Sequence, residues 1–494
     1  MRKPNVIIKA FDGDSTDAVT LERAFRDIPL GTCITIGEAV PWETRIAAEK
    51  RIEMRAERVR ICEYPGVDWN AILPLDEGII EDMRHAEAVV MQMVERYARY
   101  MERYRIAGDI PYHERRRQYF AHLRYWNHVL ETERIDLFLM NHMPHQCYDY
   151  VLYYLCKRKN IPVLYMNRFF AMDGMYISEN WEHPAPDLQA AFRRIREEYA
   201  DPQRPIPLSK NYEYYFSFYR KKTPEKPWYM EENIYTRPNF VRKWWRKGLK
   251  VLRREPLRFT ASMLSPAFWS RKLGQHRAIA FYKQHTQQPD LSQPYVYVPL
   301  HLQPEATTIP LAGAFVDQER VVQLLAAHLP PGIRLYVKEH PAQGEEWRSE
   351  DFYKTLLSIP SVTLIPKEAD TYALLDHCIA VASCAGTVLF EASIRQKPSF
   401  MFGHDIWQYG PGVHCIRTSQ DCRAAVEDIL NNRASHSVRD VRLYLKAFDE
   451  SATPFPGPTE SPVDNATDEE KAVNVGALLE RHIRRVLNLP APQS

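Results

Sequence analysis

The sequence predicts an α/β fold made of two doubly wound, Rossmann-like domains. The chain has 494 residues, which is too long for one hydrophobic core. Strand-like and helix-like patterns alternate in two separate stretches, as is typical of parallel sheets covered by helices on both faces. Between them, at residues 186–292, the alternation gives way to a basic, aromatic-rich segment that we expect to be a helical insert or linker.

The first stretch, residues 1–185, is expected to form the N-terminal domain. It begins with a short strand at 6–10 and contains a long charged helix at about 76–107. Its clearest βαβ unit is a strand at 135–140, a helix at 147–159 and a strand at 162–166.

The second stretch, residues 293–435, is expected to form the C-terminal domain. Its predicted strands are 295–300, 334–337, 362–365, 379–382 and 398–402, and its predicted helices are 317–328, 350–358, 372–377 and 387–395. A final part, 436–494, contains a Pro/Ser/Asp/Glu-rich loop at 451–468, which we expect to be exposed or disordered. An amphipathic helix at 469–487 follows, and we expect this part to pack back on the N-terminal domain. Two such domains with a cleft between them make the predicted fold GT-B-like.

Composition narrows the class of protein. Hydrophobic residues make up 45% of the chain and charged residues 26%, as in ordinary globular proteins. The net charge of +2 gives no general attraction to nucleic acid. No run approaches the roughly 18 apolar residues of a membrane span, and the first residues do not resemble a signal peptide. We therefore expect a cytoplasmic protein.

Four loops of the C-terminal domain follow predicted strands and combine residues able to bind a ligand. Ligands of open α/β sheets lie at the carboxyl ends of the strands, so these loops are the first place to search. They are 301–308, Lys338 to Pro341, 383–387 with Glu391 in the helix behind it, and 403–404. The residues that we expect to bind a nucleotide sugar are His301, Gln303, Glu305, Lys338, Pro341, Ser383, Gly386, Thr387 and Glu391.

The 383–387 loop contains the residues whose possible ligand contacts are easiest to infer. Small residues at a strand-to-helix turn let backbone N–H groups and hydroxyls approach a phosphate. Glu391 lies four residues after Thr387 on the same helix face, where it can accept hydrogen bonds from ribose hydroxyls. Taken alone, the turn could equally be a plain helix cap and Glu391 a surface carboxylate.

His340 is the candidate that assists the departing nucleotide. Pro341 fixes it at a strand end, where its ring can donate to a phosphate oxygen. Lys338 adds charge there or faces solvent.

These segments also resemble a known family. The pattern is His340-Pro341, then Ser383-x-x-Gly386-x-x-x-Phe390-Glu391-Ala392, then Lys397-Pro398-x-x-x-Phe402-Gly403. It is similar to the capsule polysaccharide synthesis family of bacterial glycosyltransferases, GT-B enzymes that transfer Kdo from CMP-Kdo. The resemblance implies that His340 contacts the CMP phosphate, that Ser383, Gly386 and Thr387 contact phosphate or cytidine, and that Glu391 lies at the ribose.

The resemblance also implies a catalytic carboxylate in the N-terminal domain. The family carries a Glu-Asp-Gly motif there, and the counterpart in this chain is Met172-Asp173-Gly174, which keeps the Asp and Gly but not the first acid. Asp173 could act as a general base for inversion or as a nucleophile for retention. The alternative is that Asp-Gly is simply a turn.

Other candidates are weaker. His142 and His145 lie in a predicted strand-end loop and could bind the acceptor, although loop histidines are commonly plain surface. Asp12-Gly13-Asp14 resembles a DxD metal motif, but short Asp/Gly turns are common after first strands. We expect no metal and no cofactor besides the donor. Residues 241–254 carry seven Lys or Arg with Trp and Leu, which suits either peripheral contact with a membrane or packing within the protein.

The leading hypothesis is a glycosyltransferase that moves a CMP-linked Kdo or related ulosonic acid to a glycan or lipid-linked glycan of the bacterial surface. One alternative is a teichoic-acid-type transferase that uses CDP-glycerol or CDP-ribitol. Another is a non-catalytic nucleotide-binding scaffold, which the missing acid before Asp173 favours.

Overall fold

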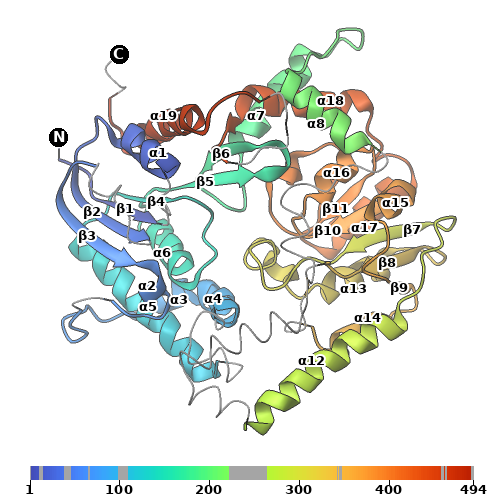
Figure 1. Ribbon diagram of the computed structural model, residues 1–494, viewed down its shortest axis with the longest axis horizontal. Helices are drawn as coiled ribbons and strands as arrows, with labels where there is room; N and C mark the ends of the chain where they lie inside the picture. Colours follow the sequence, from blue (N-terminus) through green and yellow to red (C-terminus); the bar gives the residue numbers. More distant parts are fainter. Residues whose placement is uncertain are drawn as a thin grey trace. The chain divides into compact units, whose positions relative to one another are not determined.

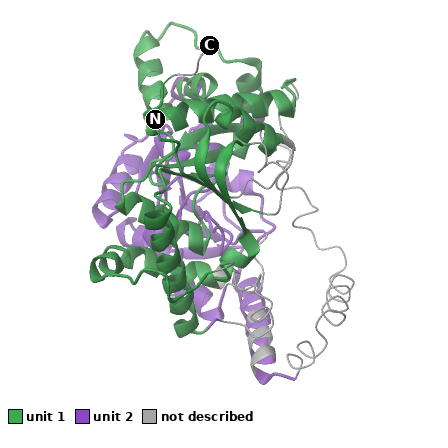
Figure 2. Cartoon of the chain, turned by 90° about the vertical axis from the view of Figure 1, so that its left-hand side faces the viewer, with its two compact units in different colours: residues 1–97, 111–215, 443–494 green, residues 98–110, 216–442 purple. Residues whose placement is uncertain are grey.

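The computed structural model describes residues 2–9, 15–37, 46–64, 67–97, 110–221, 264–341, 343, 348–457, 461 and 464–490. It divides into two compact units, coloured separately in Figure 2. Unit 1 comprises residues 1–97, 111–215 and 443–494, and unit 2 comprises 98–110 and 216–442. The Asp12–Asp14 turn, the basic segment 241–254 and the end of the predicted 76–107 helix lie outside the described residues.

Unit 1 contains a mainly parallel sheet. Within the described residues it has seven strands in the order β13-β6-β5-β4-β1-β2-β3. These strands are β1 (Val6–Lys9), β2 (Leu30–Gly37), β3 (Ala48–Arg55), β4 (Leu137–Met140), β5 (Val163–Phe169), β6 (Gly174–Ser178) and β13 (Thr453–Pro454). Pairing is parallel from β3 to β5, whereas β6 runs antiparallel to both β5 and β13. The sheet is therefore a doubly wound Rossmann-like sheet with an antiparallel extension.

The helices of unit 1 follow the predicted alternation, with one correction. They are α1 (Ser15–Phe25), α2 (Ala56–Arg60), α3 (Glu77–Asp82), α4 (Arg84–Tyr97), α5 (Tyr112–Thr132), α6 (Cys147–Arg158), α7 (Pro186–Glu198) and most of α8 (Lys210–Arg220). The single helix expected from residue 76 is broken at Met83, which closes α3 before α4 begins. Asp76 caps α3, because its side chain accepts a hydrogen bond from the Ile79 N–H.

The C-terminal part of the chain returns to unit 1. After α18 (Val438–Ser451), β13 pairs with β6, and Phe455 is buried in the core. The prediction of an exposed or disordered loop is therefore wrong for the start of 451–468, because this segment completes the sheet. Helix α19 (Asp468–Val486) lies beside α1 (Figure 1), where the Thr20 hydroxyl donates to the Ala472 carbonyl at 3.2 Å.

Unit 2 contains a second parallel sheet. Among the described residues its six strands run in the order β12-β11-β10-β7-β8-β9, and every pairing is parallel. The strands are β7 (Tyr295–Pro299), β8 (Arg334–Lys338), β9 (Val362–Ile365), β10 (Ala380–Ser383), β11 (Ser399–Met401) and β12 (Val413–Cys415). The five predicted strands are present with ends shifted by at most two residues, and β12 adds a short edge.

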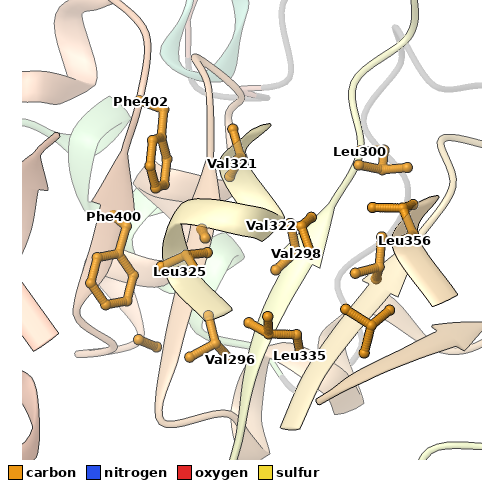
Figure 3. Close-up of a cluster of buried hydrophobic side chains, with 14 of the residues drawn as sticks. Val296, Val298, Leu300, Val321, Val322, Leu325, Leu335, Leu356, Phe400 and Phe402 are labelled. Carbon is orange, nitrogen blue, oxygen red and sulfur yellow. The ribbon is translucent and has the colours of Figure 1, made fainter. Parts of the chain in front are cut away.

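Helices cover both faces of this sheet. They are α12 (Pro266–His285), α13 (Glu319–His328), α14 (Glu350–Leu357), α15 (Thr371–His377), α16 (Val388–Ile394) and α17 (Ser419–Leu430). Figure 3 shows one face, where Val322 and Leu325 of α13 pack against Val296 and Val298 of β7. Burial of each such side chain stabilises the fold by about 1.5–3 kcal/mol, so this layer holds β7 firmly in the centre of the sheet.

The boundaries of the two compact units differ from the domain boundaries predicted from the sequence. The pattern put boundaries near 185, 292 and 435, whereas the compact units meet at 215/216 and 442/443, within α8 and α18. No helix in the described ranges has the length and apolarity that crossing a membrane requires. Both units are Rossmann-like, as the alternation predicted.

The contact between α19 and α1 gives a first test of the fold. A methyl group on Gly476 would lie 2.6 Å from the Thr20 carbonyl oxygen and 2.7 Å from Arg23 Cβ. Because backbone cannot move aside cheaply, Gly476→Ala should lower the free energy of unfolding by about 1–3 kcal/mol in urea denaturation. Gly274→Ala is the matched control, since nothing lies within 4 Å of its new methyl and alanine favours a helix by about 0.5–1 kcal/mol. Equal effects of the two changes would contradict the tight contact.

Candidate functional site

The strand order of unit 2 brings two of the predicted loops together. Strands β7, β8 and β9 succeed one another on one side, and the chain then returns to place β10 on the other side of β7. At such a reversal the loops that follow the two neighbouring strands diverge and leave a crevice at their carboxyl ends. The loop after β7 begins with His301, and β10 ends with Ser383.

His301 accepts the hydrogen bonds of the 383–385 turn. Its Nε2 lies 2.8 Å from Ser383 Oγ, and it accepts from the backbone N–H groups of Cys384 at 3.2 Å and Ala385 at 3.3 Å. The lone pair of Nε2 is therefore engaged, so the proton of the neutral ring sits on Nδ1. We expected these N–H groups to face a phosphate, and in the structure they face the imidazole.

Gly386 permits this close approach. A methyl group at its Cα would lie 2.9 Å from His301 Cε1 and 3.2 Å from Ser383 Oγ. Any larger residue would push the imidazole away from the turn. Gly386 of the predicted motif is thus explained by the space that His301, from the loop after β7, needs beside it.

Burial keeps the histidines of this cluster neutral. Burial, helped by nearby His340 and Arg348 and opposed by Glu305, lowers the pKa of His301 to about 4. Burial also lowers the pKa of His340, against the opposing charges of Glu339 and Glu305. Because His301, His340 and Glu305 act on one another electrostatically, the loops after β7 and β8 form one cluster.

The 301–308 loop is held in place by glutamine side chains that were not among the predicted site residues. The side chain of Gln343 bonds both backbone groups of Gln303, at 2.8 and 3.0 Å. Gln318 accepts from the His301 N–H at 2.7 Å, and Arg348 donates to the His301 carbonyl at 3.1 Å. Gln303 itself accepts from Arg348 through Oε1 at 2.6 Å. The predicted residue Gln303 is therefore part of the framework that positions His301.

A buried ion pair anchors this framework. Glu339, directly before His340, accepts from Arg348 Nε at 3.0 Å and from the Tyr353 hydroxyl at 2.9 Å. Both charged side chains are almost fully buried. Removing one partner of such a pair costs about 3–5 kcal/mol, because the other charge is left buried. Glu339 also accepts from the His340 N–H at 2.9 Å, which fixes the backbone at His340.

Three other predicted residues lie at the edge of this arrangement. The Glu305 carboxylate accepts from the Thr307 N–H at 2.9 Å and closes its own turn. The buried Lys338 ammonium donates to the Ala369 carbonyl at 2.6 Å and to Thr371 Oγ1 at 2.7 Å, so it holds the start of α15 instead of facing solvent. Burial lowers the Lys338 pKa to about 8. Pro341 is exposed.

Glu391 is buried within α16, not on its surface. Burial raises its pKa to about 7, while the charge of Arg395 and a hydrogen bond from the Thr387 side chain lower it. The carboxyl group therefore changes protonation state near neutral pH. Thr387, four residues earlier, is its direct partner, as the helical spacing predicted.

The sequence of this region is similar to a known family. Residues 267–441 match the family model described as capsule polysaccharide biosynthesis protein, and they contain every candidate residue of unit 2. Among proteins with curated descriptions, none matches the sequence.

Solved structures with matching folds are distant. One is Alr3699/HepE of Anabaena in complex with UDP, with 11% identity, a TM-score of 0.28 and coverage of 97% of this chain and 100% of that one. A second is KpsC of Thermosulfurimonas dismutans, a beta Kdo 2,7 transferase, with 12% identity, a TM-score of 0.29 and coverage of 72% and 89%. A third is the UDP-GlcNAc 2-epimerase of Methanocaldococcus jannaschii, with 11% identity, a TM-score of 0.25 and coverage of 89% and 97%.

The family match does not reach Asp173, which belongs to unit 1. Asp173 lies at the turn between the antiparallel strands β5 and β6, with left-handed backbone angles (φ 50°, ψ 37°). It is 4% exposed, and the Tyr215 hydroxyl donates to its Oδ2. The next residue must be small: a methyl group at Gly174 would lie 2.1 Å from the Phe169 ring, so only glycine fits there without a shift. The Asp-Gly pair thus has a structural role as a turn, whatever its chemistry.

His142 and His145 meet at the carboxyl end of β4. Their ring centroids are 4.3 Å apart, and each Nδ1 lies 2.9 Å from the Met143 carbonyl. With Asp149 they form a group whose ligand atoms could hold a metal ion. The Lys9 ammonium already lies among them, 2.5 Å from Asp149 Oδ2 and 3.2 Å from His142 Nε2. Lys9 thus already bonds two of the three side chains that could hold a metal ion.

The raised pKa of Glu391 predicts the direction in which folding stability changes with pH. Since folding raises this pKa from 4.5 to about 7, Glu391 favours the folded state below pH 4.5, and that contribution is lost as the pH rises through 7. Glu391→Gln should therefore be more stable than the wild type at pH 8, by at most about 3 kcal/mol, and nearly equal to it at pH 4.5. Urea unfolding at both pH values measures this.

The control is Glu427→Gln, a change at an exposed carboxylate of the same unit. It should leave the pH dependence of stability unchanged. The same stability difference at pH 4.5 and pH 8 for Glu391→Gln would show that Glu391 does not titrate in this range.

Proposed function

We propose that this protein is a glycosyltransferase of bacterial surface-polysaccharide assembly that takes its sugar from a nucleotide donor bound by unit 2. The observation that carries the proposal is the meeting of His301, Ser383 and Gly386 at the strand reversal of unit 2, within the segment that matches the capsule polysaccharide biosynthesis family model. The donor we propose is CMP-linked Kdo or a related ulosonic acid.

The donor contacts that we propose are assigned residue by residue. Ser383, Gly386 and Thr387 approach the phosphate or the cytidine, and Glu391 accepts hydrogen bonds from the ribose. His340 donates to the phosphate oxygen as the nucleotide departs, which stabilises the developing charge. His301, Gln303 and Glu305 shape the loop above Ser383, Lys338 holds the start of α15, and Pro341 is proposed to line the donor site beside His340.

The charged groups of this cluster are neutral or paired within the protein. His301 stays neutral at pH 7, since its pKa is about 4, and the guanidinium of Arg348 pairs with Glu339. We therefore expect the donor to be held at this cluster by hydrogen bonds more than by charge.

For catalysis we propose Asp173, acting as general base on the acceptor hydroxyl or as nucleophile toward the anomeric carbon. His142 and His145 are proposed to contact the acceptor, a glycan or lipid-linked glycan. The burial of Asp173 and its bond to Tyr215 favour the second candidate, a non-catalytic scaffold that binds nucleotide.

We further propose that the protein works in the cytoplasm at the inner face of the cytoplasmic membrane, with contact through residues 241–254. The support is the sequence of that segment, in which basic residues alternate with Trp and Leu. Transfer is proposed to need neither nucleic acid nor a metal.

Nucleotide binding is the direct test of the donor site. At concentrations about 100-fold above the Kd, CMP should raise the thermal midpoint of the full chain by about 2–5 °C, and UDP and GDP should not. Gly386→Ala should abolish the shift by displacing His301, and Gly274→Ala should retain it. A shift by CDP alone would indicate a CDP-glycerol-type or CDP-ribitol-type transferase, and one confined to UDP or GDP would refute the cytidine donor.

Donor turnover separates the enzyme from the scaffold. Asp173→Asn keeps the shape of the side chain and an acceptor for Tyr215, so it should preserve the CMP shift while lowering transfer at least 100-fold. Tyr215→Phe is the control for the hydrogen bond alone. Full transfer by Asp173→Asn would remove Asp173 from the mechanism, and CMP binding by a wild-type protein that never consumes the donor would establish the scaffold.

A further inference from the structure

Helix α12 of unit 2 has one packed end and one exposed end. In its second half, Ala278 and Tyr282 are buried in the core that α14 also covers. In its first half, Trp269 is 52% exposed and Leu273 is 51% exposed, and Leu264, just before the helix, is 77% exposed. Figure 1 shows this first half extending beyond the sheet of unit 2. The helix is therefore anchored at one end and presents apolar side chains at the other.

Trp269 and Leu273 form one apolar patch, which we call the α12 patch. The two residues are four positions apart, so they lie on the same face of the helix. A methyl group on Gly274, the next residue, would meet no atom within 4 Å, so the space beside the helix is open there. Single exposed apolar residues are ordinary on protein surfaces, whereas large apolar residues that adjoin one another mark an interaction surface.

The charges that α12 carries are all positive. The sequence of the helix contains no Asp or Glu, and its basic residues are Arg271, Lys272, Arg277 and Lys283. Glu350 of α14 acts on Arg277 electrostatically, but the Glu350 carboxylate is itself paired with Lys354 at 2.7 Å. The α12 patch therefore lies on a cationic helix, and the partner that it fits is anionic.

A bilayer with anionic headgroups matches both properties of this helix. The indole of Trp suits the boundary between headgroups and acyl chains, because its ring is apolar and its N–H is polar. Lys and Arg beside such residues are attracted to anionic lipid. The bilayer needs no groove shaped for the patch, since its surface adapts to a projecting helix end.

We propose that the first half of α12 docks on a bilayer that contains anionic lipid, with Trp269 and Leu273 entering the headgroup region. The inference deepens the membrane contact of the proposed function and rests on it, but α12 is a different element from residues 241–254. At the packed end, the Tyr282 hydroxyl accepts from the Glu339 N–H at 3.1 Å, directly before His340. Docking of α12 would therefore set the orientation of the donor cluster relative to the bilayer.

Vesicle flotation of the full chain tests this, with vesicles of phosphatidylcholine alone and of phosphatidylcholine mixed with phosphatidylglycerol. The wild type should bind the anionic vesicles at least tenfold more strongly than the neutral ones. The double variant Trp269→Gln/Leu273→Gln should bind the anionic vesicles at least tenfold more weakly than the wild type. Leu430→Gln is the matched control, because Leu430 is a 43% exposed leucine of the same unit. It should float as the wild type does.

A charge variant tests the electrostatic part separately and keeps the apolar residues. Arg277→Gln should weaken binding to the anionic vesicles about fivefold and leave binding to the neutral vesicles unchanged. Its control is Arg423→Gln, at an exposed arginine of α17, which should have no effect. Since all these positions are exposed, the thermal midpoint of each variant should equal that of the wild type. Equal binding of the wild type to both kinds of vesicle would overturn the role of anionic lipid.

The remaining outcomes separate this proposal from the proposed function. Equal flotation of the wild type and the double variant would overturn the role of α12 and leave contact through 241–254 standing. Failure of the wild type to float would refute both membrane contacts, while a CMP shift in the same samples would preserve the donor site. A wild-type dimer that becomes a monomer in the double variant, measured by light scattering, would show that the α12 patch binds a second copy and would overturn the proposal.

Discussion

The reversal of strand order beside the first strand of each sheet is the constraint on which both candidate sites depend. In unit 2 it makes β10 the neighbour of β7, although more than 80 residues separate His301 from Ser383. In unit 1 it makes β4 the neighbour of β1 and joins Asn141 to Lys9. Because all these strands are parallel, their carboxyl ends meet at one edge, and polar loop residues from distant parts of the chain gather there.

Holding such loops in place requires buried polar groups, and the two units solve this differently. Unit 2 surrounds the 301–308 loop with Gln318, Gln343 and the Glu339–Arg348 pair, which satisfy its backbone. Unit 1 uses the fully buried Lys9–Asp149 pair. Asp149 also accepts from the Gln146 N–H at 2.7 Å, so it caps α6 as well. Each network is costly to break, which makes the loops rigid supports for a ligand.

Sequence patterns predicted the central strands of unit 2 and strands β1, β4 and β5 of unit 1, because strands buried on both faces form continuous apolar runs. They missed β2, which lies between β1 and β3. The patterns did not predict strands whose residues lack an apolar run and which form only through pairing with other parts of the chain. Strand β3 (AEKRIEMR) is an exposed edge with charged residues, and β6 depends on β13, nearly 280 residues later. In the site, His301, Ser383 and Gly386 were predictable from loops after strands. Arg348, Gln318 and Gln343 were not, because their roles arise only from contacts that folding creates.

The electrostatics of unit 2 explain how this site can recognise a ligand without strong charge. A histidine with a pKa near 4 serves as a hydrogen-bond acceptor at every physiological pH, so the donors of the 383–385 turn share the single lone pair of His301 Nε2. If the proposed phosphate took these donors, His301 would yield them, and binding would be an exchange of one acceptor for another. Selectivity would then come from the shape that Gly386 maintains between the imidazole and the turn, more than from attraction between charges.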